Sequence, residues 1–253
     1  MYVYYYDSSF EGLLTAVFDM YARHEQPDAL LANEMPLPMF AVQEHHVITD
    51  PAKAERVWKG VMARTDRYVS DMLIYVWLSE EPESDMLLMR YMRKIFDYPK
   101  GKIYDFNDTD ILQAKKTAQR VSQERHRLIQ FIRFRKTADG TYFAATAPRH
   151  NALPLVINHF RNRFADQKWI IYDLSRDYGY GYDLSQVTEL RLDRTMMTSA
   201  GDLPEEMYDP QDRLYGRLWK EYYETLGIKE RYNPALRRRN MPVRYWKYMT
   251  EFK

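Results

Sequence analysis

Apolar residues recur every three or four positions over long stretches of this chain, a spacing that places them on one face of a helix. The pattern predicts helices at 10–23, 51–63, 66–79, 84–97, 108–128, 153–165 and 209–226. Shorter runs rich in tyrosine, isoleucine and valine predict strands at 3–6, 44–48, 169–174 and 178–184, and a hairpin at 130–147. Hairpins lie among helices, so we predict an α+β fold, mainly helical, whose short strands form a mixed or antiparallel sheet.

The domain organisation follows from length and from the lack of linkers. A chain of 253 residues can form one large domain or two closely packed smaller ones. It contains no repeat, low-complexity tract or Gly/Ser linker. We therefore expect a single compact domain over 1–253, with a helical subregion at 51–128. No stretch approaches eighteen apolar residues and the N-terminus does not resemble a signal peptide, so we expect a cytoplasmic, non-membrane protein.

The helix predicted at 108–128 has an apolar side and a basic side. Lys116, Arg120 and Arg127 lie nearly opposite the apolar stripe. Arg125 falls inside that stripe, which has three explanations. The helix ends before Arg125, the stem of Arg125 reaches toward solvent, or its guanidinium is buried against a carboxylate. The stripe itself holds Ile111, Ala114, Ala118, Val121 and Leu128.

Charge is unevenly distributed although the formal net charge is only +1. Lysine and arginine concentrate in 113–136 and 229–253, and acidic residues concentrate in 79–85 and 202–212. This separation allows a basic face suited to a phosphate backbone, provided that the two basic stretches lie side by side in the fold. The alternative is that both stretches are ordinary solvated surfaces.

The second basic stretch mixes cations with aromatic rings. Basic side chains can neutralise phosphates, and Tyr245, Trp246 and Tyr248 offer faces for unstacked bases. Alternatively, Trp246 anchors the tail to the body of the protein. Together with the helix cations Lys116, Arg120 and Arg127, the predicted nucleic-acid contacts are Arg237, Arg238, Arg239, Arg244 and Lys247.

Several kinds of chemistry gain no support. The chain has no cysteine, which excludes an iron–sulfur cluster, a thiolate zinc site, a disulfide or a cysteine nucleophile built from its own side chains. It also lacks a phosphate-binding glycine loop, a GxSxG elbow and an HExxH helix. The neighbours His45 and His46 point to opposite faces of a strand, and Asp108 or Asp110 is better placed to cap a helix than to bind calcium. We predict no metal site and no cofactor.

The segment PRHNALPLVINHFRNRFADQKWIIYD, residues 148–173, has the character of a site. Polar residues in its loop, in its helix and at the end of its last strand occupy the positions where sites are usually built. The alternative is that Asn151 caps the helix, Asp173 closes a turn and the histidines are surface groups. The candidate catalytic residues are His150, Asn151, His159, Arg163 and Asp173.

Three segments carry a family resemblance: FEGLLTAVF near the N-terminus, the segment 148–173, and the ending ERYNPALRRRNMPVRYWKYMTEF. Together they resemble a bacterial family described as DNA metabolism or DNA repair proteins, a domain of unknown function, over nearly the whole chain. Members of that family are encoded beside a DNA-repair radical SAM protein, and a similar domain is fused in front of a uracil-DNA glycosylase-like domain. The resemblance implies work on DNA with a radical SAM partner, but it supplies no catalytic residues.

Three functions follow from these observations. The first is a nucleic-acid-binding accessory protein in DNA repair or modification, whose radical SAM partner holds the cluster that this cysteine-free chain cannot hold. The second is an enzyme that acts on DNA or a nucleotide through the His150 and Asp173 region. The third is an interaction scaffold without affinity for DNA.

Overall fold

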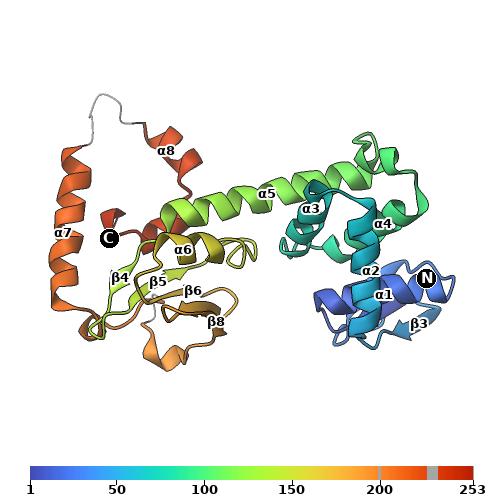
Figure 1. Ribbon diagram of the computed structural model, residues 1–253, viewed down its shortest axis with the longest axis horizontal. Coiled ribbons are helices and arrows are strands. Elements are labelled where there is room, and N and C mark those ends of the chain that lie inside the picture. Colours follow the sequence, from blue (N-terminus) through green and yellow to red (C-terminus); the bar gives the residue numbers. More distant parts are fainter. Residues whose placement is uncertain (199–200, 227–232, 253) are drawn as a thin grey trace. The chain divides into compact units, whose positions relative to one another are not determined.

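The protein is described by a computed structural model over residues 1–198, 201–226 and 233–252 (Figure 1). Its contacts group into two compact units, Met1–Ser122 and Gln123–Lys253. The predicted α+β class is confirmed, although the strands form two sheets instead of one. That the whole chain acts as a single domain stays a prediction. Part of the second basic stretch, including the start of the ending quoted above, lies outside the described residues.

The first unit contains a parallel three-stranded sheet in the order β2-β1-β3. Its strands are β1 (Tyr2–Tyr6), β2 (Ala29–Ala32) and β3 (Gln43–His46). The central strand β1 is buried because α1 (Phe10–Ala22), which leads from β1 toward β2, packs against it. The side chain of Ser9 caps α1 by accepting a hydrogen bond from the backbone N–H of Gly12 at 2.9 Å.

The remaining helices of the first unit match the periodicity of the sequence closely. They are α2 (Pro51–Arg64), α3 (Arg67–Trp77), α4 (Ser84–Asp97), the 3₁₀ helix η1 (Lys100–Tyr104) and the first part of α5 (Thr109–Phe131). Aspartate caps fix where several of them begin: the carboxylate of Asp50 accepts from the N–H of Ala52 at 2.8 Å, and that of Asp66 accepts from the N–H of Val69 at 2.9 Å. One apolar core, which includes Leu13, Leu73, Leu88 and Ile111, joins these helices to the sheet.

The second unit contains a mixed five-stranded sheet in the order β4-β5-β6-β7-β8. Its strands are β4 (Arg135–Lys136), β5 (Tyr142–Thr146), β6 (Trp169–Asp173), β7 (Tyr178–Tyr182) and β8 (Val187–Leu190). Only β5 and β6 pair in parallel, because α6 (Ile157–Arg163) returns the chain between them. The predicted hairpin is β4–β5, and Gly140 supplies the positive φ of +85° that its turn requires.

The C-terminal part of the second unit is helical. It consists of the 3₁₀ helices η2 (Arg194–Met196) and η3 (Glu205–Met207), the helices α7 (Pro210–Thr225) and α8 (Pro234–Asn240), and the 3₁₀ helices η5 (Val243–Tyr248) and η6 (Thr250–Phe252). No residue of α7 is buried. This helix therefore presents aromatic and leucine side chains to solvent, contrary to the usual fate of an apolar stripe.

Throughout the ranges that the structure describes, no helix has both the length and the apolar character that crossing a lipid bilayer requires.

Candidate nucleic-acid groove

A groove of about 1670 Å³ opens on the second unit, lined by α7, by the chain just before and within β4, by the end of α6 and by Thr250. Six of its lining side chains are cationic and two are carboxylates, Glu205 and Asp212. The lining therefore carries an excess of positive charge, which favours an anionic ligand. The cations are Arg133, Arg135, Arg163, Arg213, Arg217 and Lys220.

The lining cations differ in whether a carboxylate already neutralises them. Arg133 donates to Glu251 at 2.9 Å and Arg213 donates to Glu205 at 3.3 Å. Arg163 and Arg217 are exposed and make no ion pair or hydrogen bond with any residue that the structure describes. These two guanidinium groups are available to an incoming ligand.

Aromatic rings line the groove together with these cations. Trp219 and Tyr222 lie one turn apart on α7, with ring centroids 5.7 Å apart and planes inclined by 30°. Both side chains are largely exposed, at 41% and 55%. The indole N–H of Trp219 donates to the Oε2 atom of Glu251 at 3.2 Å, which holds the ring by its edge. The aromatic lining comprises Phe134, Phe164, Tyr215, Trp219 and Tyr222.

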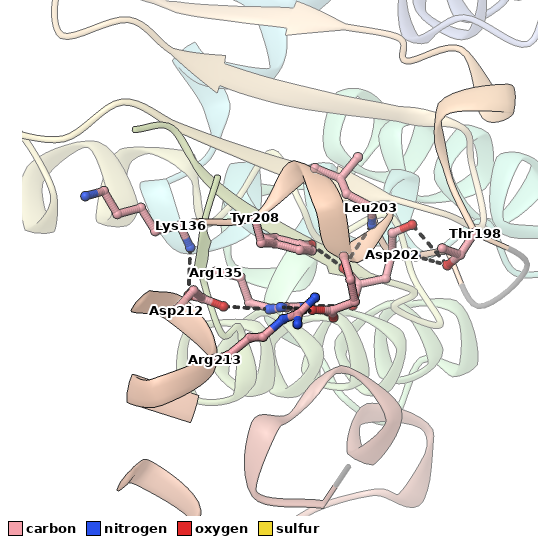
Figure 2. A network of polar contacts seen from close by, with 9 residues as sticks. Arg135, Lys136, Thr198, Asp202, Leu203, Tyr208, Asp212 and Arg213 are labelled. Atoms are coloured by element: carbon pink, nitrogen blue, oxygen red, sulfur yellow. Dashed lines mark hydrogen bonds and ion pairs between the residues drawn. The ribbon is translucent and has the colours of Figure 1, made fainter. Parts of the chain in front are cut away.

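The start of α7 is fixed by a polar network around Arg135 (Figure 2). Arg135 donates from Nε to Asp212 at 2.9 Å and from its two terminal nitrogens to Glu205 at 2.8 and 3.1 Å. Its guanidinium lies 3.5 Å from the ring centroid of Tyr208, whose hydroxyl donates to Asp202. Burial lowers the pKa of Arg135, but the hydrogen bonds that it donates to Glu205 and Asp212 outweigh this effect and raise the pKa overall.

This network also neutralises the acidic side of the groove. Both lining carboxylates, Glu205 and Asp212, accept hydrogen bonds from Arg135, and Asp212 accepts from the backbone N–H of Lys136 at 3.0 Å. Charge-assisted hydrogen bonds of this kind are strong and geometrically specific. The network therefore anchors α7 to β4 and keeps the two carboxylates from repelling an anion.

Three of the predicted catalytic candidates lie together at the junction of β6 and β7. Asp173 is completely buried and pairs with Arg176 at 2.9 Å. Arg176 also donates to the backbone carbonyls of Pro148 and Arg149, the two residues that precede His150, at 3.2 Å each. Burial raises the pKa of Asp173, and the contacts with Arg176 oppose that rise only in part.

The neighbours in this cluster are also tightly held. His150 is buried, and Asn151 accepts a hydrogen bond from the hydroxyl of Tyr178. Asn151 does not cap α6, because this helix begins at Ile157 with Val156 in the capping position, whereas Asp173 does close the turn after β6 by accepting from the N–H of Ser175 at 2.9 Å. None of the three candidates lines the groove.

Two of the predicted nucleic-acid contacts converge on one buried carboxylate. Glu124 on α5 is 1% exposed and accepts from Arg244 and from Arg127, the latter at 3.4 Å. It also accepts from the hydroxyl of Tyr245 and from the backbone N–H of Arg149, each at 2.8 Å. Burial raises the pKa of Glu124, but the hydrogen bonds from Arg149, Tyr245 and Arg244 and the charge of Arg244 lower it more, so its pKa lies below the ordinary value.

The other predicted basic residues are distributed over both units. Lys116 is exposed, and Arg120 pairs with Glu81 at 2.9 Å; both belong to the first unit. Arg238 and Arg239 are exposed on α8. In the same unit, the guanidinium carbon of Arg237 lies 5.0 Å from the ring centroid of Trp246, and the Nζ atom of Lys247 lies 4.7 Å from that of Tyr248.

Two open alternatives from the sequence are decided by these contacts. The helix does not end before Arg125, because α5 continues to Phe131; the half-buried Arg125 donates to the backbone carbonyl of Leu155 at 3.2 Å, not to a carboxylate. Trp246 packs against the ring of Phe252 at 4.9 Å and donates to the carbonyl of Met241 at 3.0 Å. It therefore anchors the tail, as the second interpretation had it.

Of the remaining candidates, His159 is exposed on α6, with its ring against Phe160 at 5.3 Å, while Arg163 lines the groove. Sequence reasoning missed the contribution of α7. Arginine and lysine at 213, 217 and 220 interleave with aromatic residues at 215, 219 and 222, and this pattern was the available signal. It was overlooked because an apolar stripe on a helix normally faces a core.

The residues considered for metal binding have other partners. His45 lies 3.0 Å from Asp19, and Asp108 caps α5 by accepting from the N–H of Asp110 at 2.9 Å. Within the described ranges, no group of three histidine, aspartate or glutamate side chains is arranged to hold a metal ion.

Residues 82–251 match the model of a family described as a domain of unknown function, DUF4130. The matched region covers more than half of the chain, and it includes every residue that lines the groove. No curated protein and no solved structure matches the chain.

Proposed function

The chain belongs to the DUF4130 family, and on the basis of its groove we propose that it binds nucleic acid through its second unit. The observation that carries this proposal is a pair of guanidinium groups without a partner among the described residues, Arg163 and Arg217, in a groove with six cations and two neutralised carboxylates. A phosphate backbone is a polyanion, and its affinity for a protein comes largely from such side chains.

The biological role that we propose is that of an accessory protein in DNA repair or DNA modification. The resemblance of the sequence to DNA metabolism proteins supports DNA as the ligand and a radical SAM protein as the partner. The chain has no cysteine with which to hold an iron–sulfur cluster, and this agrees with a partner that holds it. In this proposal the chain presents the nucleic acid and the partner carries out the chemistry.

The enzyme hypothesis draws less support from the geometry. Asp173 and His150 are 0% and 3% exposed, and the groove does not reach them. A general acid or base must come within hydrogen-bonding distance of the group that it protonates or deprotonates. The ion pair of Asp173 with Arg176 and the turn that it closes fit a structural role instead.

A binding titration tests the proposal. We expect labelled DNA to bind measurably in fluorescence anisotropy at about 50–100 mM salt, with an affinity that falls as salt rises. Replacing both Arg163 and Arg217 with alanine should weaken binding about tenfold or more. It should also reduce the slope of log affinity against log salt by about 0.7–0.9 per lost phosphate contact.

The matched control is Arg161→Ala. Arg161 is exposed on the same helix as Arg163 but does not line the groove, so its loss should change affinity less than twofold. If the wild-type protein binds no DNA at this salt concentration, the scaffold hypothesis replaces the proposal. If Arg161→Ala weakens binding as much as the double variant does, the groove is not the binding site.

A further inference from the structure

The groove offers aromatic faces that a double helix cannot use. In a duplex the bases are stacked within the helix and only their edges are accessible in the grooves. Trp219 and Tyr222 are about half exposed on α7, and a third ring, Tyr215, is 64% exposed one turn before Trp219. Aromatic side chains of this kind are the features on which unpaired bases stack.

We infer that the groove takes an unpaired nucleic-acid strand, with bases stacked on Trp219 and Tyr222 and phosphates bound by Arg163 and Arg217. The inference rests on the proposed nucleic-acid binding and specifies which form of the ligand the groove selects. Every base has a π-face, so stacking of this kind is tolerant of sequence.

The orientation of the principal ring is set before any ligand arrives. The indole N–H of Trp219 donates to Glu251, which is only 7% exposed and is held from its other oxygen by Arg133 at 2.9 Å. Because the ring is fixed through its edge, its rotation would cost this hydrogen bond while its exposed surface stays accessible. Preorganisation of this kind reduces the entropy that binding must offset.

The charges around the rings are compatible with a phosphate backbone. Glu251 is neutralised by Arg133, and Glu205 and Asp212 are neutralised by Arg135. The lining cations that remain without a described partner, Arg163 and Arg217, come from α6 and α7 respectively. They belong to different elements that line one groove, so a strand in the groove has phosphate contacts from both elements.

An exposed aromatic helix face could also bind a protein. The occupant that fits this groove must carry negative charge together with flat rings or apolar groups, because the lining combines an excess of cations over carboxylates with aromatic side chains. An unpaired strand supplies both features at every nucleotide. An acidic peptide supplies the charge, and competition by polyglutamate therefore distinguishes the two occupants.

Three labelled ligands of equal length test the inference with the full chain: oligothymidylate, a duplex, and a strand of abasic deoxyribose phosphates. A length of about 12 nucleotides lies within the site sizes typical of single-strand binding proteins. We expect oligothymidylate to bind about tenfold or more tightly than either of the others, because only its bases can stack. An oligouridylate of the same length then shows whether DNA or RNA is preferred, and tight binding of either supports an unpaired strand.

Variants separate stacking from charge. Trp219→Ala and Tyr222→Ala should each weaken oligothymidylate binding about tenfold and leave abasic-strand binding within twofold. Trp219→Phe loses the hydrogen bond to Glu251 but keeps a ring on which a base can stack. It should therefore recover most of the affinity that Trp219→Ala loses. Tyr68→Ala removes a similarly exposed ring (52%) from the first unit and serves as the control. The side chain of Tyr222 makes no hydrogen bond with any residue that the structure describes, and its backbone carbonyl still accepts from Leu226 in the alanine variant, so this variant is the one expected to keep full stability.

The results of these titrations distinguish failure of the unpaired-strand inference from failure of nucleic-acid binding itself. If the duplex or the abasic strand binds as tightly as oligothymidylate, or if neither ring variant weakens binding, the unpaired-strand inference is overturned while nucleic-acid binding stands. If none of the nucleic acids binds, the proposed function and the inference fail together. If polyglutamate displaces oligothymidylate at equal charge concentration, an acidic protein segment is the occupant.

Discussion

Two regions of the second unit combine arginine with aromatic side chains. In one region these side chains bind a carboxylate within the fold, and in the other they remain accessible. Around Glu124, the cations Arg127 and Arg244 and the hydroxyl of Tyr245 all point at one buried carboxylate. In the groove, Arg163 and Arg217 have no carboxylate among the described residues, and Trp219 keeps its ring exposed. The first region holds the tail to α5, whereas the second is open to a ligand.

The difference shows that the number of cations in a segment does not decide whether it binds an anion. Arg244 is followed by a tyrosine and a tryptophan in a strongly basic stretch, and its position in the sequence suggests phosphate binding. Its charge is nevertheless committed to Glu124 within the fold. A cation contributes to ligand binding only as far as its existing pairing leaves it available.

The largest effect expected from testing this comparison comes from Glu124→Gln. The substitution removes the charge that Arg127 and Arg244 share but keeps the shape of the side chain. We expect the free energy of unfolding to fall by about 3 kcal/mol, as is typical when one member of a buried ion pair is lost. Urea denaturation followed by circular dichroism measures this change.

The control for this prediction is Glu81→Gln in the first unit. The side chain of Glu81, which pairs with Arg120, is 22% exposed against 1% for Glu124, so its substitution should cost less than about 1 kcal/mol. Equal effects of the two substitutions would mean that the Glu124 cluster is no more stabilising than a surface ion pair. DNA affinity should be unchanged in a Glu124→Gln protein that remains folded, because the groove is not altered.

A smaller effect is expected in the pH dependence of stability. The contributions of the two buried carboxylates, Glu124 and Asp173, should change in opposite directions as pH rises. The pKa of Glu124 lies below its ordinary value of 4.5, so the stability that it contributes is present above that pH and is lost as pH falls through the lowered pKa. The pKa of Asp173 lies above its ordinary value of 3.8, so its contribution is present below that pH and is lost as pH rises through the raised pKa.

Urea titrations between about pH 3 and pH 7 compare the wild-type protein with Glu124→Gln and with Asp173→Asn. The stability advantage of the wild type over Glu124→Gln should grow with pH, and its advantage over Asp173→Asn should shrink. If the two stability differences changed with pH in the same way, the two carboxylates would experience the same balance of burial and pairing. That result would contradict the different contacts of Glu124 and Asp173.

The smallest effect is expected for Arg120→Ala. Arg120 is 45% exposed and already paired with Glu81, so we expect less than about 1 kcal/mol of lost stability and less than a twofold change in DNA affinity. Anisotropy titration beside Arg217→Ala measures the contrast. An Arg120 variant that weakened DNA binding as strongly as Arg217→Ala would mean that a paired surface cation still contributes to binding.

The sequence predicted most helices well because their determinants are local. The boundaries of α2 and α4 follow from apolar periodicity, from the Asp50–Pro51 start of α2 and from the distribution of charge. The strand β2, with the sequence ALLA, was missed because four apolar residues without alternation carry no clear period. The strand β8, with the sequence VTEL, was missed because four residues, two of them polar, are too few to show a period.

What the sequence determined by itself is therefore most of the helices up to α7, the α+β class, the absence of thiol chemistry and the family resemblance, whereas α8 (Pro234–Asn240) was not predicted. Only the tertiary structure decided which charges are paired and which rings are covered. Glu124 and Arg244 are 120 positions apart, and no local pattern encodes their contact. The face of α7 likewise has the periodicity of a buried helix, and only the packing of the whole unit leaves it exposed. Pairing and burial depend on distances in space, and these are set when the chain folds.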